Sequence, residues 1–586
     1  MRTVPLRIAL FASVLTGLAV SAGSARDTPP PDTPQQALQE APQETPQETR
    51  REPRHEMRLP QITSAKVDWP AALASLSEVA ELRSTALTVP ARQARSSASW
   101  PVPRALARLN AAVAQRLPGI TRSPVPVLLP FDTEALMRDL AAGTAADGNE
   151  RYLAGFQASK FFYPGPSGYD AVFSLRTAEV PELADISYPE PIDVLISGSA
   201  LLYDLEDPTP PSAAPASALE SEYPGIQRLI HEHHLRYTFV RFGVPYVVSA
   251  ACFDSSVSRY KMPTCRAADR VLQRFLRALR VAGGTPAPPR MVQLLGVERP
   301  AQMSPAFTYH APGRLLPSTG FRGRSGLADT TVYSQIRFPL AETPAYVNSQ
   351  MFQRGNRSQE PAAIFSYPWR DNFCERRGFP VGQCPGGHGH QGQDIRTQAC
   401  APGLIGERCY GDRNLVAVRD GAILRRPKQE AVYLFVNTAN EHIRFRYLHM
   451  LPRKMDEDSL LSGRRVHEGE VIGQIGNFHK REGGTSYHLH FDVQVPTRDG
   501  WVFVNPYMTL VAAYERLIGG RGEEIVPAVA IATTDLSTTG TAAPASIAIE
   551  PEQAQRPRRG DRASKKRKAG KHAKHQKRKK YRIARR

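Results

Sequence analysis

Long hydrophobic runs, paired-cysteine motifs and internal repeats are scarce or absent in this 586-residue chain. Only residues 8–20 form a strongly apolar run, which is shorter than the ~20 residues that span a bilayer. We therefore predict that the mature protein is soluble or peripheral. The six cysteines include no Cys-x-x-Cys pair, which argues against a zinc site built from cysteines. Acidic residues are nearly absent from positions 556–586, where 17 lysines and arginines accompany one aspartate.

The apolar run near the start has the flanks of a secretory signal. Arg2 and Arg7 precede it, and small residues at 22–25 offer cleavage points. We predict a signal peptide over residues 1–25 and export to the periplasm or cell envelope. A membrane anchor of one helix is the alternative.

The even number of cysteines suits an oxidising compartment. The simplest connectivity pairs neighbours along the chain. The pairs are then Cys252–Cys265, Cys374–Cys384 and Cys400–Cys409.

The positive charge of the chain is concentrated in its tail. The signal region and residues 556–586 carry nearly all of the net charge of +19, so the rest is nearly neutral. We predict that the tail binds anionic envelope polymers or lipids, with a purely solubilising role as the alternative. The export signal argues against nucleic acid as a partner.

Composition divides the chain into several parts, which predicts a multidomain protein. Residues 26–62 are a linker rich in Pro, Gln and Glu, and residues 525–586 form a disordered segment that includes the basic tail. Residues 63–295 are predicted to form an α+β domain of unknown role, and residues 325–512 a compact all-β unit with glycine-punctuated strands. The elements predicted in the first domain are strands within 126–131, 193–203 and 236–251 and a helix over 267–282.

Two short motifs in the all-β unit carry the residue types that catalytic zinc requires. His390 and Asp394 stand four residues apart, and His488 and His490 stand two apart. On a strand, side chains two residues apart share a face, so the two imidazoles are predicted to lie on one side of a sheet. Catalytic zinc takes three N or O ligands and keeps one position open for water.

These motifs stand in an order that resembles the lysostaphin and LytM family of zinc endopeptidases. The resemblance covers residues 330–512. Its motifs are His390-x-Gly392-x-Asp394-Ile395, Ala417-x-x-Asp420-Gly421, Tyr447-Leu448-His449, Gly463-x-x-Val466-x-x-Gly469-x-x-Ile472-Gly473-x-x-Gly476-Asn477, His488-Leu489-His490-Phe491 and Val504-Asn505-Pro506.

The resemblance implies a two-sheet antiparallel β fold and hydrolysis of peptidoglycan peptides. It implies that His390, Asp394 and His490 bind one zinc ion, and that His449 and His488 are the catalytic histidines. No glutamate follows the first histidine as in His-Glu-x-x-His enzymes, so a histidine is expected to be the general base.

Some features depart from the family pattern. Asp492 stands where the family usually has glutamate, and a Cys374–Cys384 loop precedes the first ligand. We interpret His388, His467 and His479 as ordinary surface histidines.

Two other functions are open to such a chain. Relatives that have lost ligands act as non-enzymatic activators of other wall hydrolases, but all five site residues are present here. A D-alanyl-D-alanine carboxypeptidase would space its first His and Asp more widely than four residues.

Overall fold

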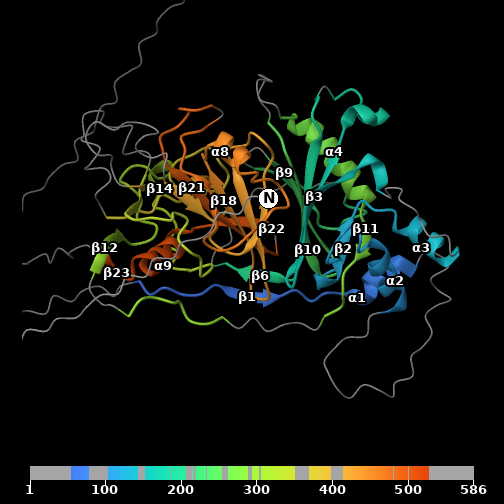
Figure 1. Cartoon of the computed structure of the whole chain (residues 1–586), viewed down its shortest axis with the longest axis horizontal. Helices are drawn as coiled ribbons and strands as arrows, with labels where there is room; N and C mark the ends of the chain where they lie inside the picture. The colour runs from blue at the N-terminus through green and yellow to red at the C-terminus, as the bar shows by residue number, and fades with distance from the viewer. Residues whose placement is uncertain are drawn as a thin grey trace, which may run out of the picture. The chain divides into compact units, whose positions relative to one another are not determined.

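The computed structural model of the chain (Figure 1) describes residues 55–77, 103–142, 152–205, 214–215, 219–253, 262–287, 294–349, 368–397 and 413–526, apart from gaps of one to three residues. All of them belong to one compact unit that spans residues 1–528. The predicted signal peptide, the third cysteine pair and the basic tail lie outside the described residues. The linker predicted over 26–62 is described from residue 55 onward, and its last residues enter strand β1 (Gln61–Ser64), which pairs with β6 (Leu201–Asp204).

The first part of the unit is built around a seven-stranded antiparallel sheet. Its order is β3 (Gln157–Gly165), β4 (Gly168–Leu175), β5 (Ile192–Ser199), β10 (Val244–Ala251), β9 (His234–Arg241), β8 (Gln227–His231) and β7 (Ala214–Pro215). Helix α4 (Cys265–Ala278) contacts β5, β9 and β10 (Figure 1). Helices α1 (Trp69–Ser77), α2 (Arg104–Val113) and α3 (Thr133–Ala142) complete this part around one apolar core.

Helix α4 begins and ends differently from the sequence prediction of 267–282. Thr264 caps it, because its side chain accepts a hydrogen bond from the Ala267 amide at 3.1 Å. The helix stops at Ala278, and Arg280–Gly283 instead forms strand β11, which pairs with β2 (Val127–Leu129). The spacing of the apolar residues at 279–282 is compatible with a helix and with a strand. Pairing with the distant strand β2 therefore decides their structure.

The run predicted as strand over 236–251 is a hairpin of β9 and β10. Phe242 and Gly243 form its two-residue turn, with positive φ angles of 54° and 71°. A Cβ on Gly243 would approach the Lys66 carbonyl oxygen to 2.0 Å, so this turn requires glycine for space as well as for conformation.

The second part contains an eight-stranded antiparallel sheet. Its order is β13 (Ala345–Val347), β14 (Gln393–Thr397), β21 (Leu489–Thr497), β18 (His442–Leu448), β17 (Val432–Asn437), β16 (Gly421–Leu424) and β19 (Arg465–Val466), with β22 (Gly500–Val504) also paired to β21. A two-stranded sheet of β15 (Asn414–Val416) and β20 (Val471–Gln474) accompanies it. This agrees with the predicted antiparallel β architecture. The all-β unit predicted over residues 325–512 is not purely β, because it contains helix α8 (Pro452–Glu457) and the first half of helix α9 (Tyr507–Ile518). Helix α9 also continues beyond the predicted boundary at residue 512.

Strand β21 separates an apolar face from a polar face. Leu489, Phe491, Val493 and Val495 belong to the core that this sheet shares with α9. The alternate residues His490, Asp492 and Gln494 therefore lie on the opposite face, although they too are buried. The candidate site begins on this polar face.

A buried ionic network joins the two sheets. Asp170 of β4 accepts hydrogen bonds from Arg444 at 2.8 Å and pairs with His442 at 3.0 Å, both on β18. The other nitrogen of His442 lies 2.9 Å from the Ser199 hydroxyl on β5. The two sheets therefore contact each other through specific polar pairs as well as through apolar packing.

None of the helices among the described residues is long and apolar enough to cross a membrane.

Candidate active site

Three potential metal ligands converge where β14 meets β21. Asp394 lies opposite His490 in the register of these strands, and His390 precedes β14. The Nε2 atom of His390 lies 2.9 Å from Nδ1 of His490 and 3.4 Å from Oδ1 of Asp394. His490 Nδ1 lies 3.3 Å from the same oxygen. Gly392 permits this approach, since a Cβ there would meet the Phe491 carbonyl oxygen at 2.3 Å.

The ligand atoms of these three residues all lie within 4.8 Å of one another and are buried. The Oδ2 atom of Asp394 is buried and has no hydrogen-bond partner among the described residues. An orphaned buried carboxylate oxygen is costly unless a cation or donor satisfies it. The site therefore fits a zinc ion, which accepts two imidazoles and one carboxylate.

The protonation states of the group also suit a cation. Burial alone would raise the pKa of Asp394, but the neighbouring His390 and His488 outweigh it and hold that pKa well below its ordinary value. Burial lowers the pKa of His390, so its imidazole is neutral at neutral pH. Burial opposes charge on His490 as well, yet Asp394 and Asp492 raise its pKa. The two carboxylates therefore favour a positive charge at His490. A histidine must be deprotonated to bind a metal, so a bound cation would supply that positive charge in place of the proton.

The two histidines expected to be catalytic flank the same group. His449 follows β18 with a φ of 70°, a left-handed conformation that is uncommon for residues other than glycine and is enriched at functional sites. Its ring centroid lies 4.7 Å from that of His488 and 6.2 Å from that of His490. His488 Nε2 lies 3.5 Å from Asp394 Oδ1. His488 is thus almost as close to this oxygen as His490 is.

Backbone carbonyls fix the tautomers of the two catalytic candidates. The Nδ1 atom of His449 lies 2.8 Å from the Phe478 carbonyl oxygen, and Nδ1 of His488 lies 2.7 Å from that of Ser486. A carbonyl oxygen only accepts, so each Nδ1 carries the proton and each Nε2 keeps its lone pair. Burial lowers the pKa of His488 to about 3 and that of His449 well below its ordinary value. Both rings are therefore neutral at neutral pH, and each keeps a lone pair at Nε2.

The ligand candidates are themselves oriented by further groups. Nδ1 of His390 donates to the Asn372 carbonyl oxygen at 3.0 Å, which leaves Nε2 for a metal. Nε2 of His490 lies 3.3 Å from Asp492 Oδ2, and Asp492 in turn pairs with Arg446. The sequence drew attention to Asp492 only as a departure from the family pattern. Its spacing of two residues from His490 on an extended segment is the signal that could have placed both side chains on one face.

Replacing Asp492 with asparagine is expected to weaken zinc binding by ~10–100-fold, because the His490 ring loses the carboxylate that holds it. Zinc retention measured against a chelator of known affinity gives this value. Asp185→Asn is the matched control, since that carboxylate is 69% exposed and distant in sequence from the site. Equal affinity in Asp492→Asn and wild type would contradict the orienting role.

Of the three histidines interpreted as surface residues, His388 and His467 are exposed, and His467 is 89% so. His479 is half exposed but belongs to the rim of the site, with its ring centroid 5.7 Å from that of His449. Glu430 lies 3.9 Å from His479. The ligand atoms of Glu430, His449 and His479 all lie within 4.8 Å of one another. Sequence reasoning missed the first and last of these, because only the fold brings them to His449.

Two of the three predicted disulfides are present, Cys252–Cys265 and Cys374–Cys384. The second lies directly beside the site, since the Cys374 amide donates to the His390 carbonyl oxygen at 2.9 Å. It therefore braces the loop that carries the first ligand candidate. The Cys400–Cys409 pair lies outside the described residues.

No protein-family model and no curated protein matches this chain. A solved structure from Ruminococcus gnavus ATCC 29149, which carries the provisional name of glycyl-glycine endopeptidase lytM, is similar to part of it. The identity is 18% and the TM-score 0.19, over 32% of this chain and 62% of that one.

Proposed function

We propose that this chain is a zinc-dependent endopeptidase that hydrolyses peptide bonds in the stem peptides or cross-links of peptidoglycan. The observation that carries the proposal is the convergence of His390, Asp394 and His490 on one buried point, beside the neutral imidazoles of His449 and His488. When bound in such a set of ligands, zinc lowers the pKa of a water molecule toward ~7 and polarises a carbonyl group.

The side chains of the chain have separable tasks in this proposal. Asp394 and the two ligand histidines hold the cation, and Asp492 orients His490. His449 and His488 present an unprotonated Nε2, at which each is able to accept a proton from water and return it to a leaving amine. Burial of all five side chains, none more than 8% exposed, keeps bulk water away from these transfers.

The peptidoglycan substrate is proposed from the ordered motifs and from the export signal, with which the disulfides agree. A non-enzymatic activator remains the second candidate. The presence of all five residues in one cluster favours the enzyme, because an activator requires neither neutral bases nor a complete ligand set.

The test is digestion of purified sacculi by the zinc-loaded full chain, with zinc content measured in parallel. We expect soluble peptide fragments from the loaded protein, none after chelation, and recovery when zinc is returned. A matched Asp394→Ala protein controls for contaminating hydrolases. Digestion that survives both chelation and Asp394→Ala would rule out the proposed chemistry.

The basic tail is proposed to tether the enzyme to anionic envelope polymers or lipids. Removing residues 553–586 is expected to reduce retention on isolated envelopes at low salt, because this segment holds most of the net charge. Raising the salt should release the full chain as well, since screening shortens the Debye length to ~3 Å at 1 M. Equal retention of both proteins at low salt would contradict the tether.

A further inference from the structure

Arg396 lies beside the candidate active site and is almost completely buried, with 1% of its surface exposed. It stands two residues after Asp394 on β14, so the two side chains project from the same face of the sheet. In the antiparallel register of β14 and β21, Asp394 lies opposite His490. Two residues further along β14, the same register places Arg396 opposite His488.

The guanidinium group of Arg396 contacts the segment that precedes His488. Its Nη1 atom donates to the Ser486 hydroxyl at 3.2 Å and to the Tyr487 carbonyl oxygen at 3.0 Å. Its Nε atom donates to the Asn348 side-chain oxygen at 3.0 Å, and Asn348 directly follows β13, the neighbour of β14 on the other side. A guanidinium donates in a rigid planar fork, so these contacts fix the position of the segment before His488.

That segment determines where His488 carries its proton. Nδ1 of His488 donates to the Ser486 carbonyl oxygen at 2.7 Å. Nε2 of the same ring lies 3.5 Å from Asp394 Oδ1, on the side of the proposed ligand set. Displacement of the Ser486 carbonyl oxygen would remove the acceptor that selects this tautomer. The ring could then carry its proton at Nε2, where it would have no lone pair for a proton from water.

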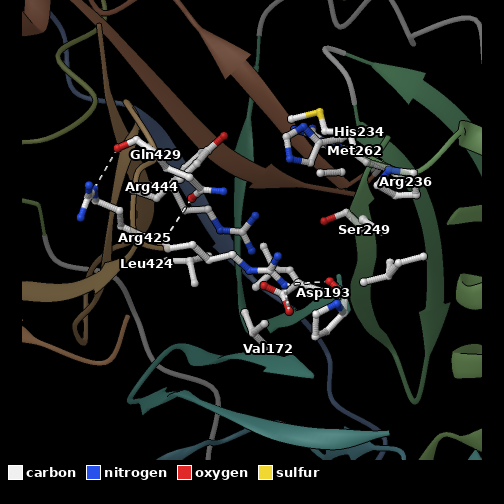
Figure 2. Close-up of a pocket in the computed structure, with 18 of the residues that line it drawn as sticks. Val172, Asp193, His234, Arg236, Ser249, Met262, Leu424, Arg425, Gln429 and Arg444 are labelled. Carbon is white, nitrogen blue, oxygen red and sulfur yellow. Dashed lines mark hydrogen bonds and ion pairs between the residues drawn. The ribbon is translucent and has the colours of Figure 1, made fainter. Parts of the chain in front are cut away.

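Two other buried arginines of the chain, Arg425 and Arg444, make different contacts; both are labelled in Figure 2. Arg425 pairs with the carboxylate of Asp456. Arg444 pairs with that of Asp170. The Nε and Nη1 atoms of Arg396 instead donate to neutral oxygens on segments next to the site. These donors therefore place oxygen atoms around the site, whereas the other two arginines join carboxylates.

We propose that Arg396 is a positioning residue, which holds the segment before His488 so that this ring keeps its proton at Nδ1 and its lone pair at Nε2. The inference rests on the proposed function, because it assigns a task within the same site. Arg396 acts through His488 and touches neither the ligand set nor the substrate.

Arg396→Met removes the donors and keeps an unbranched apolar stem. We expect kcat on soluble peptidoglycan fragments to fall roughly 10–100-fold, since a small misplacement of a catalytic group is enough for such a loss. KM should stay within about twofold, and the chain should retain about one zinc ion, because substrate binding and the ligand set are unchanged. Arg396→Lys keeps the charge and a donor, so its kcat should lie between those of Arg396→Met and the wild type.

Two comparisons separate positioning from general stability. Arg516→Met is the matched control and should keep the wild-type kcat, because Arg516 also donates to neutral oxygens, including the carbonyls of Glu298 and Ile336, away from the site. The double variant Arg396→Met/His488→Ala should digest no more slowly than His488→Ala alone, since a residue that acts through His488 has no further effect once that ring is gone. A further loss in the double variant, an equal loss in Arg516→Met, or a wild-type kcat in Arg396→Met would overturn the proposal.

The tautomer of His488 gives a readout that requires no hydrolysis. Nuclear magnetic resonance of the chain, labelled with a heavy nitrogen isotope in its histidine rings, distinguishes protonated from unprotonated ring nitrogens, and His488→Ala identifies the signals. We expect His488 to carry its proton at Nδ1 in the wild type, and to lose this preference in Arg396→Met and partly in Arg396→Lys. The same tautomer in all three proteins would refute the positioning role, even if the chain digests sacculi. The expected spectra from a chain that digests nothing would contradict the proposed function and still support the role of Arg396.

Discussion

Replacing His449 with alanine is expected to leave about one zinc ion per chain while hydrolysis of peptidoglycan falls by ~10²–10⁴-fold. The reason is geometric. The ring of His449 lies 6.2 Å from that of His490, and its Nδ1 is held by the Phe478 carbonyl oxygen, so it borders the ligand set without belonging to it. Loss of a general acid or base removes proton transfer and leaves the ligands in place.

The ligand variants are expected to behave differently. His390→Ala, Asp394→Ala and His490→Ala should each lose zinc and activity together, because each removes a donor from the three-residue set. His488→Ala is the informative case, since its Nε2 lies 3.5 Å from the Asp394 oxygen that His490 approaches to 3.3 Å. We assign it to catalysis and expect it to retain zinc.

Metal analysis and a sacculus-digestion assay on the five variants separate these roles, and His467→Ala controls for loss of an exposed imidazole. If His449→Ala lost zinc as readily as His490→Ala, the division into ligands and catalysts would be wrong. If all five variants digested sacculi as well as the wild type does, the role of a non-enzymatic activator would be favoured instead.

Replacing Asp170 with alanine is expected to destabilise the folded chain by ~3–5 kcal/mol, the usual cost of removing one partner from a buried ion pair. Asp170 is fully buried, and its loss leaves Arg444 and His442 without their carboxylate at the joint between the sheets. Denaturant unfolding measures the change. Asp185→Ala, which removes a 69% exposed carboxylate, should change stability far less than Asp170→Ala does. Similar losses in both variants would contradict a specific role of the network.

The carboxylate of Asp170 is also expected to make the stability of the folded chain depend on pH. Burial alone would raise the pKa of Asp170, but Arg444 and His442 outweigh burial and hold it below its ordinary value. A depressed folded pKa stabilises the protein above the unfolded pKa of ~3.9, and this contribution is lost as the pH falls through the folded value. The stability difference between wild type and Asp170→Ala should therefore be constant near neutral pH and shrink below about pH 4. If this stability difference grew as the pH fell, the pKa of Asp170 would not be lowered in the folded protein.

Much of the candidate site consists of residues in short motifs, so it could be predicted from the sequence. A two-residue spacing puts His488 and His490 on one face of an extended segment, and the order of the motifs selects His390, Asp394 and His449 from the other histidines and acids. Neighbour pairing of cysteines likewise anticipated Cys252–Cys265 and Cys374–Cys384, because short loops bring such cysteines together.

The tertiary structure decided what depends on partners distant in the chain. Periodicity could not end α4 at Ala278, because the next residues become a strand only by pairing with β2. Nor could it place Arg446 against Asp492, or Arg444 against Asp170, since these contacts follow from strand register and from the packing of one sheet on another. Side-chain periodicity encodes which face of an element is buried, whereas the identity of the element that covers it is a property of the whole fold.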